Sequence, residues 1–233
     1  MDVAPNGDVI VGIRSTGGRS GVPGGVMVLR DTDGDGRADR RAKFGEFSAT
    51  EVKVQGNQVY TETGSEILRY TWNPSGMTLS GPDTIVRGLP GDRSHTAKTF
   101  VIHRGQLYVN HGSPSNACQE RDRAPESKGI DPCPELEHRG GIFRFDANRR
   151  GQTLADGERF ATGIRNAVAI AVNPRNNDLY VMQHGRDMLF QNWGEMFTAQ
   201  QSAEQPSLPS RPPSSQVSSP RTIASPQMAS HRD

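Results

Sequence analysis

Residues 106–109 read QLYV, and this short apolar alternation decides the fold because it recurs along the chain. Alternation of this kind is typical of a half-buried β-strand. Similar tetrapeptides begin at residues 8, 58 and 178, so successive starts lie 50, 48 and 72 residues apart. A second strand of related sequence follows each of the first three. The chain therefore contains an internal repeat built of strands.

The third interval is longer than the others because a polar, Pro-rich segment is inserted at residues 113–139. Without it the period is again close to 48 residues, with Gly-rich turns and no helical periodicity, which is typical of β-propeller blades. The inner strands are expected at residues 50–54, 96–102 and 167–172. The sequence predicts an all-β fold with about three complete blades and the start of a fourth, so the ring is expected to be incomplete.

Composition excludes several classes of protein. The chain has 233 residues, a net charge of +1, 26 Gly and 16 Pro. An almost neutral chain has no general attraction to nucleic acid. The longest apolar run is residues 167–172, far below the roughly 20 residues that a membrane helix needs. Residues 1–8 show no export signal, so the chain is either cytosolic or lacks its true start.

Residues 198–233 differ in composition from the rest of the chain. They contain nine Ser, six Pro and no aromatic residue, which leaves too little apolar surface to offset the entropy of ordering them. We expect a disordered tail that follows a propeller unit at residues 1–197. A Pro-rich ligand for a partner protein is the alternative. The abrupt change also resembles translation in another reading frame.

Polar residues stand at the entrances of the expected inner strands: Thr50 and Glu51, then Ser94 and His95, then Arg165 and Asn166. In a propeller these entrances gather at one mouth of the central channel. A histidine that accepts a proton, a fixed cation and an amide are the groups needed to bind and oxidise a polyol. The alternative is that these are ordinary turn and surface residues.

Four motifs carry a resemblance to a known family: SHTAKT at 94–99, GSPSNAC at 112–118, TGIRN at 162–166 and QHGRD at 183–187. Together, and in this order, they resemble the glucose/sorbosone dehydrogenases, which are quinoproteins that use pyrroloquinoline quinone (PQQ). The resemblance covers residues 1–197. It implies a partial six-bladed β-propeller of about three to four blades, and the oxidation of a sugar or sugar aldehyde in the periplasm or outside the cell.

The resemblance also implies roles for single residues. His95 corresponds to the general base that takes the proton of a substrate hydroxyl while hydride passes to the quinone. Arg165 and Asn166 correspond to residues that hold the cofactor. Gly185 and Arg186 match a loop whose backbone carbonyls bind Ca²⁺, although related enzymes often have Pro in place of Arg186. A soluble acceptor would take up the electrons.

The sequence departs from the family after residue 197, before the blades that supply further cationic cofactor contacts. We therefore expect little or no turnover from this chain alone. A non-catalytic propeller fragment, acting as a binding module or surviving as a gene remnant, is the second interpretation. A sugar lactonase is the third, but it would need an acidic metal cage at the channel mouth, where only Glu51 is available.

Carboxylates alternate at Asp31, Asp33 and Asp35, as they do at the start of a calcium loop. Position twelve of such a loop carries a bidentate Glu, but here it is Ala42. At most we expect a weak calcium-stabilised turn, and the alternative is a solvated acidic turn.

Cys118 and Cys133 lie in the polar insertion, and no zinc or haem motif accompanies them. A disulfide closing about 15 residues would contribute roughly 3 kcal/mol and would indicate an oxidising compartment. Two free thiols are the alternative.

Overall fold

The computed structural model describes residues 1–17, 21–194, 196 and 209–210. Within this part of the chain the strands form four antiparallel sheets, three of them with four strands. The first sheet contains β1 (Asp2–Val3), β2 (Val9–Ile13), β3 (Gly25–Arg30) and β4 (Arg40–Phe44). The second contains β5 (Val52–Gln55), β6 (Gln58–Glu62), β7 (Ile67–Asn73) and β8 (Thr78–Val86).

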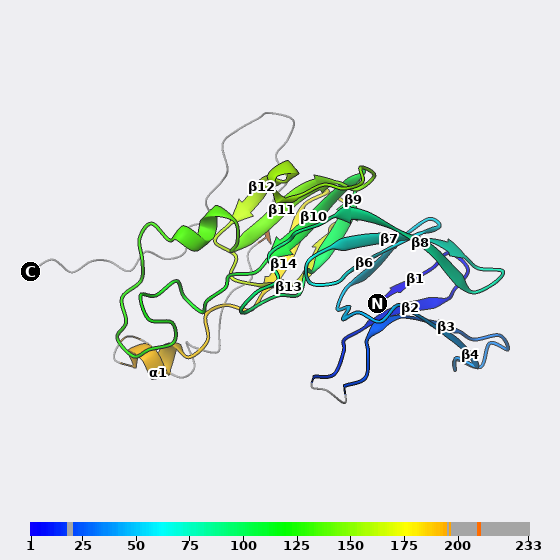
Figure 1. Ribbon diagram of the computed structural model, residues 1–233, viewed down its shortest axis with the longest axis horizontal. Coiled ribbons are helices and arrows are strands. Elements are labelled where there is room, and N and C mark those ends of the chain that lie inside the picture. Colours follow the sequence, from blue (N-terminus) through cyan, green and yellow to red (C-terminus); the bar gives the residue numbers. More distant parts are fainter. Residues whose placement is uncertain (18–20, 195, 197–208, 211–233) are drawn as a thin grey trace, which may run out of the picture.

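The third sheet contains β9 (Phe100–His103), β10 (Gln106–His111), β11 (Gly141–Asp146) and β12 (Glu158–Thr162). The fourth contains β13 (Ala167–Val172), β14 (Leu179–Gln183) and β15 (Pro209–Ser210). Short helices are η1 (Pro134–Glu137), η2 (Leu154–Asp156) and α1 (Leu189–Trp193). Each sheet is a blade, and the inner strands β1, β5, β9 and β13 contact one another in turn. The predicted partial β-propeller is confirmed (Figure 1).

The blades pack through three apolar clusters, one between each pair of neighbouring sheets. Successive side chains of a strand point to opposite faces of its sheet, so one strand of a middle blade serves two clusters. In β6, Val59 packs toward the first sheet and Tyr60 toward the third. In β10, Leu107 packs toward the second sheet and Tyr108 toward the fourth. The two middle blades are therefore buried on both faces.

The inner strand of the third blade starts at Phe100, four residues later than the predicted start at residue 96. Carbonyls between residues 90 and 96 accept hydrogen bonds from the side chains of Lys98 and Arg139, and bonding to β10 begins only at Thr99, whose carbonyl accepts from the N–H of Asn110. This segment is consequently a loop. It carries His95 into the channel mouth.

Strand alternation determines which loops share an end of the blades. The segment before β9, the β10–β11 insertion, the β12–β13 turn and the segment after β14 all lie at one end, which we call the mouth. The β3–β4 turn, which carries Asp31, Asp33 and Asp35, lies at the opposite end. The predicted calcium turn is thus separated from the mouth by the length of a blade.

Most of residues 198–233 lies outside the described residues, so the disorder predicted there remains a prediction. Within the described ranges, the helices are all too short to cross a lipid bilayer.

Candidate functional site

His95 lies at the mouth, and its hydrogen bond fixes which ring nitrogen carries a proton. Its Nδ1 is 2.6 Å from the carbonyl oxygen of Ser113. A carbonyl can only accept, so Nδ1 carries the hydrogen and Nε2 of the neutral ring keeps its lone pair. Burial, together with the charges of Arg165 and Arg123, lowers the pKa of His95 below its ordinary value. The ring is therefore a neutral proton acceptor at neutral pH.

Gly112 makes room for His95. A Cβ atom at position 112 would lie 2.4 Å from the Cβ of His95 and 3.1 Å from Oδ1 of Asn166. The contact with His95 is shorter than real Cβ atoms show, so the close approach of the two loops requires glycine. Gly112 therefore allows His95 and Asn166 to lie beside the same piece of backbone.

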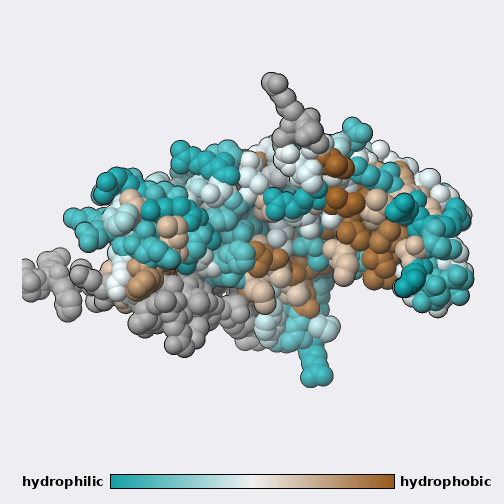
Figure 2. Space-filling view, turned by 90° about the horizontal axis from the view of Figure 1, so that it is seen from below, coloured by the Kyte–Doolittle hydropathy of each residue, from teal (hydrophilic) through white to brown (hydrophobic). Residues whose placement is uncertain are grey.

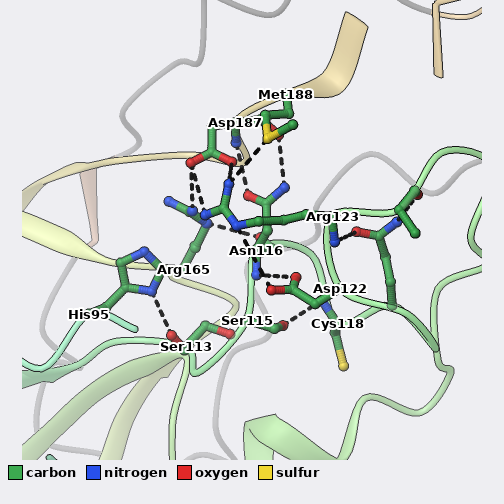
Figure 3. A network of polar contacts seen from close by, with 12 residues as sticks. His95, Ser113, Ser115, Asn116, Cys118, Asp122, Arg123, Arg165, Asp187 and Met188 are labelled. Atoms are coloured by element: carbon green, nitrogen blue, oxygen red, sulfur yellow. Dashed lines mark hydrogen bonds and ion pairs between the residues drawn. The ribbon is translucent and has the colours of Figure 1, made fainter. Parts of the chain in front are cut away.

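Arg165 anchors the centre of the site (Figure 3). Its Nε donates to the Asn116 carbonyl at 2.9 Å, and its terminal nitrogens donate to the His184 carbonyl at 3.4 Å and to the Asp187 carboxylate at 3.2 Å. Its side chain is 9% exposed. These bonds use three of the five N–H groups of the guanidinium, so the cation is held in place and still has donors for a ligand.

Asp187 joins two guanidiniums, since its carboxylate also forms a two-point ion pair with Arg123. The Asn116 side chain holds the backbone of Asp187 by donating to its carbonyl at 2.8 Å and accepting from its N–H at 3.0 Å. Figure 3 shows the Asp187 carboxylate above the two guanidiniums, with Arg165 on the side of the His95 ring and Asn116 on the other side. The β10–β11 insertion and the segment after β14 are thereby fixed to each other.

Asn166 is oriented by a buried asparagine on β10. Nδ2 of Asn110 donates to Oδ1 of Asn166 at 3.1 Å, while Oδ1 of Asn110 accepts from the N–H of Ala167 at 3.0 Å. The oxygen of Asn166 is thus engaged within the protein, which leaves its amide nitrogen as the group that a ligand would meet. His95, Arg165 and Asn166 come together at the mouth.

The other residues singled out at the strand entrances do not join this network. Glu51 forms an ion pair with Lys53 at 3.1 Å, and Thr50 donates its backbone N–H to Glu62 at 2.7 Å. Among the residues that the structure describes, the all-carboxylate group with metal-binding spacing is Asp31, Asp33 and Asp35. Among the described residues, the mouth therefore holds no acidic cage of the kind that a lactonase would need.

Arginines engage the polar groups on either side of Gly185 and Arg186. Arg165 already donates to the neighbouring carbonyl of His184, and the carboxylate of Asp187 is engaged by two guanidiniums. A metal ion there would be repelled by the same positive charges. Calcium at Gly185 and Arg186 remains a prediction.

In the acidic turn, the carboxylate of Asp31 accepts the backbone N–H groups of Gly34 and Gly36 at 2.7 and 2.8 Å, which lowers its pKa. Ligand atoms of Asp31, Asp33 and Asp35 lie within 4.8 Å of one another, and all three residues are exposed. Backbone bonds hold the turn without a metal, so calcium there also remains a prediction. In the insertion, Cys118 and Cys133 form a disulfide.

Four residues of the network were not singled out as site residues from the sequence: Asn110, Asn116, Arg123 and Asp187. Asn116 and Asp187 lie within the motifs that carry the resemblance, so the motifs contained the signal. Asn110 follows directly on the apolar run of β10, where a polar side chain is unusual. Arg123 lies in a polar loop among other charges, and no sequence signal separates it from a solvated residue.

The mouth of this propeller combines a neutral histidine with a guanidinium that is held in place. Such an arrangement is suited to binding an anionic ligand next to a proton acceptor. The sequence model described as TrAA12-like matches residues 46–216, and the chain belongs to this family. No curated protein matches the sequence.

Two solved structures show the same fold. The holo form of the pyranose dehydrogenase PQQ domain from Coprinopsis cinerea is 18% identical with a TM-score of 0.59; the match covers 79% of this chain and 48% of that one. The calcium structure of the AA12 enzyme from Trichoderma reesei is 17% identical with a TM-score of 0.59; the match covers 79% of this chain and 50% of that one. The chain thus spans about half the length of these structures. The predicted resemblance to PQQ-dependent sugar dehydrogenases is confirmed.

Proposed function

We propose that this chain binds PQQ at the mouth and takes part in the oxidation of a sugar or sugar aldehyde. The observation that carries the proposal is the geometry of His95, whose Nδ1–H is fixed on Ser113 so that Nε2 is the proton acceptor. When bound, PQQ supplies the acceptor for a hydride from the substrate carbon. Arg165 and Asn166 have N–H groups suited to the carboxylates and quinone oxygens of such an anion.

His95 takes the proton of the substrate hydroxyl on Nε2 and becomes a cation. The Ser113 carbonyl keeps the ring oriented during the transfer, because it accepts from Nδ1–H in both protonation states. The lowered pKa of His95 keeps the ring unprotonated at neutral pH. The Arg165 guanidinium, held by Asp187, stays charged and stabilises negative charge that develops beside it.

Further parts of the proposal concern partners and compartment. A soluble acceptor would reoxidise the cofactor. The disulfide supports an oxidising compartment, hence the periplasm or the cell exterior. Calcium would bind together with the cofactor, whose carboxylates would offset the positive charge near Gly185 and Arg186.

Titration with PQQ and Ca²⁺, followed by tryptophan fluorescence, tests the binding. Arg165→Met should weaken PQQ binding, because it removes the charged donor. His95→Gln should leave PQQ binding nearly unchanged and lower dye-linked sugar oxidation by about 10²-fold or more. His103→Gln is the matched control, since His103 ends β9 at the opposite end of the blade, and it should change neither quantity.

Binding comes first in this test because the chain spans about half the length of the structures it matches. PQQ binding without turnover would favour the second interpretation, a propeller that binds but does not catalyse. No PQQ binding by the wild-type chain would overturn the proposal.

A further inference from the structure

Two buried cations lie beneath the loop that carries His95, and the proton transfer described above makes no use of them. Lys98 is completely buried, and the Arg139 side chain is 8% exposed. A buried charge needs hydrogen bonds that replace the water it has lost. The groups that these cations contact therefore show what they hold in place.

Arg139 connects the two backbone segments whose residues form the His95–Ser113 bond. Its Nε donates to the Gly112 carbonyl at 2.7 Å, and one terminal nitrogen donates to the Ser94 carbonyl at 2.8 Å. Ser94 and Gly112 directly precede His95 and Ser113. Because the guanidinium is planar and its donors have a fixed geometry, a single side chain sets the spacing of the two segments.

Lys98 holds the same loop on both sides of His95. Its Nζ donates to the carbonyls of Pro90 and Thr96, both at 2.6 Å. Arg139 adds a third point through the Asp92 carbonyl at 3.0 Å. The two cations together bind five backbone carbonyls around the base.

The loop needs such restraints. The backbone of His95 lies in the left-handed region with a φ of 56°, and Arg93 has a φ of 60°. Residues other than glycine rarely adopt this conformation, and they keep it only where the surroundings hold them. The ion pair of Arg139 with Asp92 adds little, because the Asp92 side chain is 74% exposed. The contacts that matter are those to the backbone.

We propose that Arg139 and Lys98 are positioning residues that hold the loop from Pro90 to Lys98 against Gly112, so that His95 keeps Nδ1–H on the Ser113 carbonyl and presents Nε2 as the proton acceptor. The role in catalysis rests on the proposed function. The role in fixing the ring is independent of it, and can be measured without cofactor or substrate.

NMR of the histidine ring nitrogens in the full chain tests the proposal, with His95→Gln used to assign the His95 signals. The wild-type chain should show a single Nδ1–H tautomer with a lowered pKa. Arg139→Met and Lys98→Met should give a mixture of both tautomers and a His95 pKa closer to the ordinary value. Arg139→Lys keeps the positive charge but loses the planar set of N–H donors. The folded variant should therefore show the same change in the His95 signals.

Arg69→Met is the control, because Arg69 is also a largely buried arginine in an ion pair, with Asp83 at 2.8 Å, but lies in the second blade. It should lower stability and leave the His95 signals unchanged. The neighbouring charges that lower the pKa of His95 are those of Arg165 and Arg123. A shifted His95 pKa in an Arg139 variant would therefore show that the His95 ring has moved. Unchanged tautomer and pKa in folded Arg139→Lys and Lys98→Met would overturn the proposal.

Turnover provides the second measurement. In whatever sugar oxidation the PQQ-loaded chain retains, Arg139→Lys should lower kcat by up to about 10²-fold, as a misplaced catalytic group does, with PQQ affinity within twofold of wild type. A wild-type chain that binds no PQQ would defeat the proposed function, and the NMR result would still decide whether Arg139 and Lys98 position the ring.

Discussion

Gly112 is the residue whose side chain, a single hydrogen atom, allows His95 and Asn166 to lie against the same piece of backbone. Gly112→Ala would place a Cβ 2.4 Å from the Cβ of His95 and 2.9 Å from its carbonyl oxygen. We expect a loss of about 1–3 kcal/mol of stability, as in other overpacked sites, and displacement of the His95 ring. Urea unfolding and the His95 NMR signals measure the two effects.

The control is Gly129→Ala in the same insertion, where an added Cβ would have no atom within 4 Å. It should be nearly neutral. Equal effects of the two substitutions would show that the contact at Gly112 is not the cause.

His111 predicts a pH dependence of stability. It is buried and stacked on Phe143, with ring centroids 4.4 Å apart, and burial lowers its pKa to about 3. Between about pH 6.5 and 3, the unfolded chain takes up a proton at this residue and the folded chain does not. Stability should therefore fall as pH falls through this window, by roughly 1.4 kcal/mol per pH unit.

Urea unfolding of His111→Phe and wild type at pH 7 and pH 5 isolates the contribution of His111 to the pH dependence of stability. Phenylalanine can still stack on Phe143 but takes up no proton. The variant should lose less stability than wild type between the two pH values. The same loss in both proteins would show that other groups cause the acid sensitivity.

At the level of single residues, the sequence predicted which polar groups lie together at the mouth, and their roles in binding and catalysis stay a prediction. His95, Arg165 and Asn166 stand next to apolar strands, and this placement brings them to one mouth. Arg139 lies outside the motifs, and Lys98 lies inside the motif at 94–99 with no sign of its role, because the role of both depends on which carbonyls they contact. Those contacts depend on the path of two loops, which local sequence does not specify.

At the level of elements, the disulfide closes the segment between Cys118 and Cys133, and η1 with Arg139 follows directly. Replacing both cysteines by serine should lower stability by roughly 3 kcal/mol through the added freedom of the unfolded loop. Thermal unfolding of the double variant measures this. Reduced wild type is the control, and its stability should equal that of the double variant. A reduced chain as stable as the oxidised one would contradict the prediction.

Strands were predictable where apolar residues alternate or form a short continuous run. The strand expected at residues 167–172 is β13, with the same bounds. The start of β9 was not, because the carbonyls of Ser94 and Thr96 bond to the side chains of Arg139 and Lys98, and bonding to β10 begins only at Thr99. The pairing of β15 with β14 had no sequence signal, since Pro209 and Ser210 lack strand character.

At the level of the whole molecule, the last blade exposes apolar side chains. Tyr180 and Met182 on β14 are 43% and 60% exposed, and Val168 on β13 is also exposed. Figure 2 shows that the face seen from below carries apolar surface in more than one area and not on this blade alone. Exposed apolar patches favour association, so Tyr180→Ser with Met182→Ser should reduce concentration-dependent self-association in sedimentation velocity. Val22→Ser, at an exposed loop residue of the first blade, should leave the association unchanged.

Because β6 and β10 each contribute side chains to two apolar clusters, the four blades should differ in how readily they unfold locally. Neither middle blade can separate without exposing apolar side chains on two faces, whereas the first and fourth blades each have one packed face within the described residues. Amide protons of β6, β7, β10 and β11 should therefore exchange with deuterium together and last, at the free energy of global unfolding. Those of β2 and β14 should exchange earlier. Hydrogen–deuterium exchange followed by mass spectrometry measures this order, and equal protection in all four blades would show that they open as one unit.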